Sequence, residues 1–320
     1  MAAPSRPSLG KTASLLHNNL ACSGSGAFFA GVHNSVSTGG GKVTSGRLLL
    51  HDVASGASSP GPEGEQIMSI RYLEFTYGSL LCASSTNGTT IYNEDASMLL
   101  CYAPADAAAQ VPDKLRYHQG ACVVPSMQQI AIGTSKGTLV LVSAGHPSQL
   151  AVCGEAAPSG ATTEVADVCY VQATNQVVSV HNNGDIRFWD VATTPFSNCA
   201  AVASMSQAPV RAAALGLRLL VAYGPGTVCL YDVASGELQV EITAHARWLT
   251  AVAVREDAGQ VATVGEDTVL NVWAVEPTDG QVSLLHSSVV TDKLLTGVAF
   301  CSGGVGVTAY DSDVLFHVPL

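Results

Sequence analysis

The sequence contains HDVASG at His51–Gly56, WDVATT at Trp189–Thr194 and YDVASG at Tyr231–Gly236, which are three near-copies of one segment. Each copy follows an apolar run typical of a β-strand and ends in residues typical of a turn. Extending this template finds Trp273 at the end of a fourth apolar run, and weaker copies that end at Tyr92, Val142 and His317. We therefore interpret the chain as seven copies of one structural unit.

The spacing of these copies is nearly regular. The aligned positions are 51, 92, 142, 189, 231, 273 and 317, so neighbouring copies are separated by 41, 50, 47, 42, 42 and 44 residues. A period of about 40–45 residues is typical of the four-stranded blades of a propeller. The seven copies fill residues 1–320, so we expect a single domain.

Within a copy the pattern is strand, tight turn, strand. In the fourth copy, an apolar run at 177–180 leads into Asn182-Asn183-Gly184 and then into a second run at 185–189. Asn-Gly supplies the positive φ angles that a two-residue hairpin needs. The pairs at 87–88, 136–137 and 225–226 occupy equivalent turns, and runs such as 248–254 supply further strands. Because one such blade cannot bury both of its faces, the sequence predicts an all-β, seven-bladed β-propeller with four antiparallel strands per blade.

Two polar stretches interrupt the first copy, and we expect flexible loop insertions around residues 34–46 and 55–66. The first contains Gly39-Gly40-Gly41 and the second is rich in Ser, Gly and Pro, which is typical of loops. The short apolar segment Ser14-Leu15-Leu16 precedes the first copy. We expect it to close the ring by pairing with the last blade, which would remove a free sheet edge.

Composition narrows the choice of partners. The chain has 14 Lys and Arg against 25 Asp and Glu, a net charge of -11 at pH 7, and the basic residues are not clustered. Because binding to nucleic acid or to an anionic membrane surface needs clustered cations, both are disfavoured. No apolar run is long enough to span a bilayer. We therefore expect other proteins as partners, with neither nucleic-acid binding nor membrane insertion.

The cysteines argue against a metal site and for a reducing compartment. Nine Cys are scattered along the chain without a CxxC pair, whereas structural metal sites use ligands at short spacing. Free thiols in apolar strands behave as small buried hydrophobes and are kept reduced inside cells. We expect no metal, no cofactor and a cytoplasmic location.

The sixth copy carries a family resemblance. It reads Ala244-His245, then VATVGEDT at Val261–Thr268, then Trp273, and this resembles the consensus of the WD-repeat family. In that family a His, a Ser or Thr, an Asp and a Trp form a buried hydrogen-bonded tetrad. The matching positions here are His245, Thr263, Asp267 and Trp273. A buried carboxylate is costly unless its lone pairs are satisfied, so such a tetrad is chemically sensible.

The other copies depart from this consensus. The fourth keeps Ser179 and Trp189 but has Asn183 at the Asp position and no preceding His. The fifth has Pro225 and Tyr231, and the seventh keeps Asp311 but has His317 in place of Trp. Four short blocks of this sequence resemble a narrower branch of the same family. They are Asn18-Asn19-Leu20, Ala244-His245-Ala246-Arg247, Gly265-Glu266-Asp267-Thr268 and Tyr310-Asp311.

A His and an Asp near a hydroxyl could also belong to a nucleophile triad. The repeat context favours the structural interpretation of His245 and Asp267, and the sequence has no GxSxG elbow that would expose a nucleophile. We therefore predict no catalytic residues.

Arg247, Trp248 and Glu266 are the candidate partner-binding residues. They lie in turns beside the tetrad, and loops on a rigid frame are where binding residues concentrate. Arg and Trp are also enriched at the centres of protein interfaces. An alternative for Trp248 is burial in strand packing.

The family resemblance implies a non-catalytic protein–protein interaction scaffold, acting as a subunit or adaptor of an intracellular assembly. A ciliary or cytoskeletal assembly is one option at family level. Two alternatives stay open: a propeller enzyme with a channel-bound metal, and a reader of phosphopeptides or lipid headgroups. The first would need carboxylates or histidines at one end of the channel, and the second a basic pocket.

Overall fold

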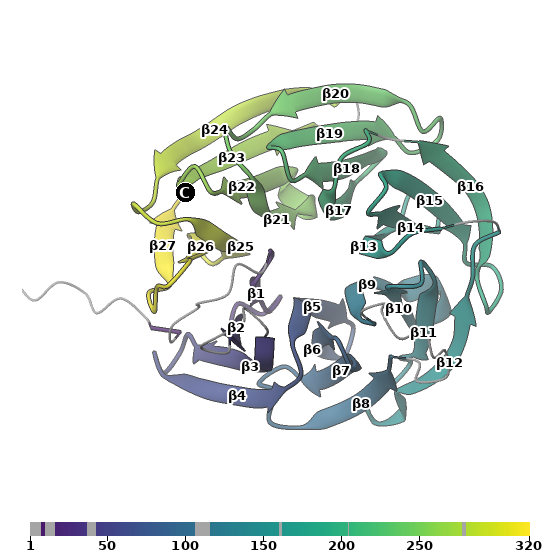
Figure 1. Ribbon diagram of the computed structural model, residues 1–320, viewed down its shortest axis with the longest axis horizontal. Coiled ribbons are helices and arrows are strands. Elements are labelled where there is room, and N and C mark those ends of the chain that lie inside the picture. Colours follow the sequence, from purple (N-terminus) through teal and green to yellow (C-terminus); the bar gives the residue numbers. More distant parts are fainter. Residues whose placement is uncertain are drawn as a thin grey trace, which may run out of the picture.

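The computed structural model describes residues 8–9, 17–36, 43–105, 116–159, 162–203, 205–276 and 280–320. Within these ranges the chain forms seven antiparallel sheets arranged as a ring (Figure 1). The first strand of each sheet lies nearest the axis of the ring, and we call the region along this axis the channel. Six sheets have four strands and the seventh has three. The predicted all-β, seven-bladed propeller is therefore confirmed.

The blades follow one another in chain order, each built from consecutive strands. Blade 1 contains β1 (Leu20–Cys22), β2 (Phe28–Val36), β3 (Val43–Asp52) and β4 (Ser58–Gly64). Blade 2 contains β5 (Ile67–Phe75), β6 (Gly78–Ser85), β7 (Gly88–Asn93) and β8 (Leu99–Pro104). Blade 3 contains β9 (His118–Val124), β10 (Gln129–Thr134), β11 (Leu139–Ser143) and β12 (Ala151–Ala156). Blade 4 contains β13 (Val165–Val171), β14 (Gln176–His181), β15 (Asp185–Asp190) and β16 (Ser197–Ala203).

Blade 5 contains β17 (Pro209–Leu215), β18 (Arg218–Tyr223), β19 (Thr227–Asp232) and β20 (Leu238–Thr243). Blade 6 contains β21 (Leu249–Arg255), β22 (Gln260–Gly265), β23 (Val269–Val275) and β24 (Val282–Val289). Blade 7 contains β25 (Leu295–Cys301), β26 (Gly304–Ala309) and β27 (Phe316–Pro319). Three short 3₁₀ turns connect strands at η1 (Pro125–Met127), η2 (Pro147–Gln149) and η3 (Glu256–Ala258).

The seven aligned positions of the repeat all fall on the third strand of a blade. Position 51 lies on β3, 189 on β15 and 273 on β23, and the other four follow the same rule. The turns that the sequence indicated join the second strand to the third. Gly137, Gly184 and Gly226 have φ angles of +80°, +92° and +103° there, a conformation that glycine adopts without strain.

The core lies between the blades rather than within them. The first strands of neighbouring blades contact one another around the channel. Second strands such as β18 are buried along their whole length, whereas outer strands such as β20 are mostly exposed. The buried apolar residues form seven clusters, one at each junction of two blades. The ring is thus stabilised by stacking, since each blade buries its faces against its neighbours.

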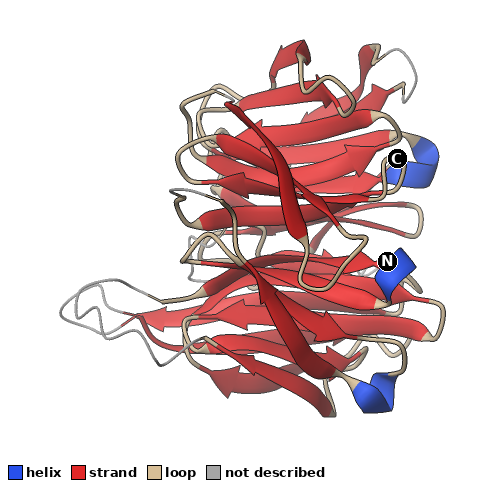
Figure 2. Cartoon of the chain, turned by 90° about the vertical axis from the view of Figure 1, so that its right-hand side faces the viewer, coloured by secondary structure: helices blue, strands red, loops and turns tan. Residues whose placement is uncertain are grey.

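The strand directions define two faces of the ring. Turns from second to third strands, and the connections between blades, lie at one end of every blade; we call this the tetrad face. Turns from first to second and from third to fourth strands lie at the opposite end. η1, η2 and η3 all belong to this opposite face, where the helices appear along one side of the ring in Figure 2.

The two predicted loop insertions need correction. The stretch 55–66 contains β4, which is the outer strand of blade 1. An outer strand pairs on one side only, so it tolerates the Pro60 and Pro62 that suggested a loop. In the stretch 34–46, Asn34 pairs with Gly46 and Ser35 with Ser45, so β2 and β3 continue into it. Residues 37–42 lie outside the described ranges.

Residues near the N-terminus contact the last blade. The segment 14–16 lies outside the described residues. Ser8 forms an antiparallel bridge with Val314, and the Leu9 N–H donates to the Asp313 carbonyl at 3.0 Å. The Leu9 side chain is buried in the cluster between blades 7 and 1. The N-terminal segment therefore contacts the last blade about five residues earlier in the chain than Ser14.

Candidate functional site

The four residues of the tetrad in blade 6 form one chain of hydrogen bonds. His245 Nδ1 lies 3.0 Å from Asp267 Oδ1 and 3.1 Å from Oδ2. His245 Nε2 lies 2.9 Å from the Thr263 hydroxyl, and the Trp273 indole N–H donates to the same hydroxyl at 3.1 Å. The backbone N–H groups of Ala246 and Val269 also donate to the carboxylate of Asp267. This set ties the entry of blade 6 to its second and third strands.

A neutral imidazole satisfies all of these hydrogen bonds. Since the Thr263 oxygen accepts from Trp273, its proton can be donated to Nε2 of His245 while Nδ1–H donates to Asp267. Burial lowers the pKa of His245 below its ordinary value, although the charge of Asp267 raises it in part. Every donor in the tetrad then meets an acceptor, as a buried polar network requires.

The hydroxyl in this set is inaccessible to a substrate. Thr263 has no exposed surface and the His245 side chain has none either. A nucleophile must approach the reacting atom to hydrogen-bond distance, and the Thr263 oxygen is already bonded to Trp273 and His245. The His–Asp pair is thus engaged in a buried hydrogen-bond network that leaves no room for a substrate at Thr263.

Blade 4 contains a related set that the sequence did not reveal. The Trp189 indole N–H donates to the Ser179 hydroxyl at 2.9 Å, and His181 Nε2 lies 2.9 Å from the same hydroxyl. His181 comes from the end of the second strand rather than from the connection before the blade. Its Nδ1 lies 2.9 Å from the Thr163 carbonyl. The sequence could have indicated this histidine, since His181 stands two residues after Ser179. The family consensus, however, has its histidine in the connection before the blade.

Blade 5 replaces the tetrad with two tyrosines. The hydroxyl groups of Tyr223 and Tyr231 lie 3.0 Å apart, and both rings are buried in the cluster between blades 4 and 5. A pair of long aromatic side chains with joined hydroxyls fills this space without an imidazole.

The candidate partner-binding residues lie next to the tetrad on the tetrad face. Arg247 is exposed, and Trp248 and Glu266 are half-buried. The N–H of Glu266 donates to the Trp248 carbonyl at 2.8 Å, so the two turns are joined. The structure thus brings these three residues together; we call them the 247–266 patch.

The Trp248 ring is held in a defined position. Its indole covers Gly224 of blade 5, where any side chain would collide with the ring. The His17 ring lies on it with centroids 6.0 Å apart and planes inclined by 33°. The indole N–H is buried and has no acceptor among the residues that the structure describes. An aromatic ring fixed in this way offers contact area at little entropic cost.

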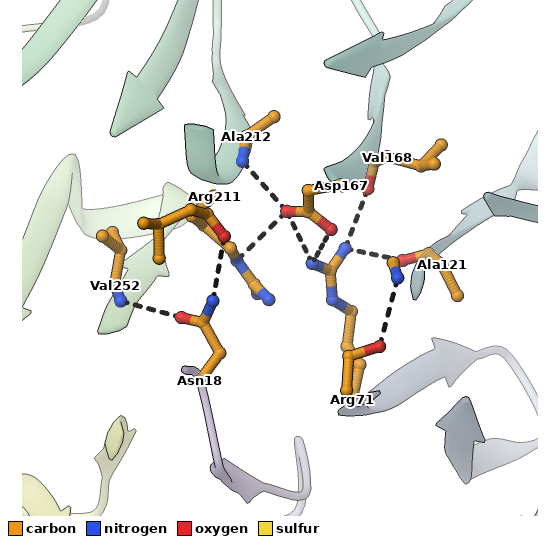
Figure 3. A network of polar contacts seen from close by, with 11 residues as sticks. Asn18, Arg71, Ala121, Asp167, Val168, Arg211, Ala212 and Val252 are labelled. Atoms are coloured by element: carbon orange, nitrogen blue, oxygen red, sulfur yellow. Dashed lines mark hydrogen bonds and ion pairs between the residues drawn. The ribbon is translucent and has the colours of Figure 1, made fainter. Parts of the chain in front are cut away.

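A polar network in the channel was missed by sequence reasoning. The Asn18 side chain donates to the Val210 carbonyl of blade 5 and accepts from the Val252 N–H of blade 6, both at 3.0 Å (Figure 3). The Asn19 amide donates to Thr296 and accepts from Thr308, both in blade 7. These two asparagines therefore connect the start of blade 1 to three other blades.

A second part of this network crosses from blade 2 to blade 4. One Arg71 nitrogen, Nη2, donates to both oxygens of Asp167, at 2.7 and 2.9 Å, and Nη1 donates to the carbonyls of Ala121 and Val168 (Figure 3). Gly120, with a φ of +73°, leaves room for the Asp167 carboxylate, which a side chain there would contact. The sequence does show Arg71 and Asp167 inside otherwise apolar strands, and charged residues in such positions indicate a buried ion pair.

Metal-ligand clusters and membrane-spanning helices are both absent from the described ranges. No group of three or more His, Cys, Asp or Glu residues is arranged to hold a metal ion there. None of the helices in those ranges has both the length and the apolar character needed to cross a bilayer.

Comparisons with known proteins agree with the sequence blocks quoted above. The family model WDR54 matches residues 12–316. The protein of Rattus norvegicus described as WD repeat domain 54, and the WD repeat-containing protein 54 of Mus musculus and of Homo sapiens, are each 24% identical over 258 residues. The matched region covers 77% of this chain and 76% of each relative.

A solved structure supports the fold. One chain of the crystal structure of the mitotic checkpoint complex superposes with a TM-score of 0.73 at 14% identity, over 98% of this chain and 90% of that one. Together with the family match over nearly the whole chain, these findings show that this seven-bladed propeller belongs to the WDR54 family of WD-repeat proteins.

Proposed function

We propose that this chain is a non-catalytic protein–protein interaction scaffold whose partner binds the 247–266 patch. The single observation that carries the proposal is the grouping of Arg247, Trp248 and Glu266 on two joined turns of the tetrad face. WD-repeat propellers as a family favour this role, since they offer rigid faces to partners.

The patch has the properties of an interface centre. It combines an exposed cation, a half-buried acid and a fixed indole whose N–H lacks an acceptor among the described residues. Trp and Arg are enriched at interface centres, and a ring that is already ordered, as that of Trp248 is, loses little entropy when a partner binds. The buried tetrad behind the turns supplies that order, because His245 and Asp267 anchor both of them.

Affinity capture with mass spectrometry tests the proposal. The charge-reversed variant Arg247→Glu/Glu266→Lys should lose the proteins that the unchanged chain captures from cells of its source. Lys293→Glu is the matched control, because Lys293 is also exposed and also stands two residues before the first strand of a blade. Equal capture by the unchanged chain and the double variant, with both folded, would sink the proposal.

A second candidate function rests on a cavity of about 320 Å³ between blades 2 and 3. Arg116 and Lys136 line it together with the hydroxyl-bearing Thr134 and Ser135. Cations and hydroxyl donors are the groups that recognise phosphorylated peptides. Fluorescence anisotropy with phosphoserine peptides and their unmodified forms tests this reader function, with Lys136→Gln as the variant expected to lose the difference.

The scaffold proposal also includes a prediction about where the protein lies in the cell. We place the protein in the cytoplasm, with association to cilia or the cytoskeleton as the assembly to examine first. Imaging of the tagged protein tests this, and a signal confined to another compartment would overturn it.

A further inference from the structure

Arg211 of β17 is the second guanidinium that faces the channel, and it is poorly compensated. Its Nε lies 3.7 Å from Asp167 Oδ2, an ion-pair distance that is too long for a hydrogen bond. The same oxygen already accepts from Arg71 Nη2 and from the Ala212 N–H, both at 2.9 Å. Arg211 Nε is buried and has no hydrogen-bond partner among the described residues. One carboxylate thus serves two arginines, and Arg71 holds it.

The terminal nitrogens of Arg211 point toward the open channel. Figure 3 shows its guanidinium between Asn18 and Asp167, with the outer nitrogens directed away from the carboxylate. The side chain of Arg211 is 20% exposed and that of Arg71 17%. Neither guanidinium is therefore fully enclosed by protein atoms, which leaves space for a small ion beside Arg211.

The charge at this level is positive and remains so at neutral pH. Burial lowers the pKa of Arg211 to about 10, and repulsion by Arg71 contributes to the change. The pKa of Arg71 is raised, because the charge and hydrogen bonds of Asp167 outweigh its burial. Besides Arg71 and Asp167, the thiol of Cys169 acts on Arg211, and burial raises the pKa of this thiol to about 12. No second carboxylate of the described chain balances the two arginines.

We propose that the central channel binds a small inorganic oxyanion against Arg211. A guanidinium offers parallel N–H donors that match two oxygens of such an anion. The anion would take the place that a second carboxylate would occupy, so the channel would hold two cations and two anions. This site is independent of the 247–266 patch, because it lies on the inner strands and not on the turns.

Inorganic phosphate and selenate serve as probes. Isothermal titration calorimetry with phosphate should show one site in the unchanged protein and at least a tenfold loss of affinity in Arg211→Met. Arg47→Met is the control of equal charge change, since Arg47 is exposed and pairs with Glu63 on the outer part of blade 1. The control should bind phosphate as the unchanged protein does.

If Arg211→Met fails to fold, a crystal of the unchanged protein grown with selenate tests the proposed oxyanion site instead. The proposal expects anomalous selenium density within hydrogen-bond distance of the Arg211 guanidinium. Absence of that density, absence of phosphate binding, or equal affinity in Arg211→Met and Arg47→Met would each overturn it.

Discussion

Blade 6 and blade 4 bury the same hydrogen bond, from a tryptophan indole to a hydroxyl on the second strand, but they recruit their histidine differently. In blade 6 the histidine comes from the connection before the blade and bonds to Asp267. In blade 4 it comes from the second strand and bonds to backbone and side-chain oxygens of residues 162–163. In both blades an imidazole bonds to the hydroxyl that accepts from the tryptophan, although the histidine comes from different positions of the repeat.

Of the changes predicted here, acidification should have the largest effect, because it should destabilise blades 4 and 6 together. Burial is the main cause that lowers the pKa values of His181 and His245, and in blade 3 it also lowers that of His118, to about 4. A histidine with a lowered folded pKa contributes stability above its unfolded value near 6.5 and loses it as the pH falls toward the folded value. For His118 alone this amounts to about 3 kcal/mol between pH 6.5 and 4.

Urea denaturation from pH 7.5 down to 4.5 measures this loss. Asp52, Asp95 and Asp232 have lowered pKa values, so they lose their contribution mainly as the pH falls below their unfolded value of about 4, and variants of the histidines isolate the histidine contribution. His181→Gln and His245→Gln should each flatten the curve. A free energy of unfolding that is constant from pH 7.5 to 4.5 would refute the assignment of neutral buried histidines.

Removing the histidine should cost more in blade 6 than in blade 4. His245→Ala leaves Thr263 and the Asp267 carboxylate without their partner, and we expect a loss of about 3 kcal/mol in the free energy of unfolding. His181→Ala leaves only neutral groups, so a loss of about 2 kcal/mol is expected. Chemical denaturation at pH 7.5 compares the two variants, and the reverse order would break the comparison.

Replacing the tetrad carboxylate of Asp267 should lower the free energy of unfolding by a moderate amount. Asp267→Asn keeps one oxygen that can accept from His245 and Val269, but it puts an NH2 donor in place of the oxygen that accepts from the Ala246 N–H. We expect a loss of about 1 kcal/mol. Melting curves at pH 7.5 test this, and a loss as large as that of His245→Ala would show that the charge itself holds the blade together.

The equivalent change in blade 4 should have the smallest effect. Asn183 is exposed and its oxygen accepts from Thr163 and Asp185 rather than from His181. Asn183→Asp should therefore alter the free energy of unfolding by less than about 0.5 kcal/mol. A larger gain in stability would mean that blade 4 can be converted to the arrangement of blade 6.

The sequence predicted the ring well because its signals are local. Gly184 and Gly226 mark turns by backbone conformation, and Trp189 and Trp273 recur at one position of the repeat. The turns also placed Arg247, Trp248 and Glu266 beside the tetrad.

The channel network was beyond prediction because it joins residues far apart in the chain. Arg71 and Asp167 are 96 residues apart, and Asn19 and Thr308 are 289 apart. Their meeting depends on how the inner strands of different blades converge, which no single repeat encodes. His181 was missed for another reason: it replaces the family's histidine from a different strand.

Hydrogen–deuterium exchange of the purified protein, with and without a captured partner, tests the central claim most directly. If the 247–266 patch is the binding site, the partner should slow exchange in peptides covering 245–248 and 265–268 and leave the turns of the opposite face unchanged. Protection confined to that opposite face, for example around η1 and η3, would contradict the account.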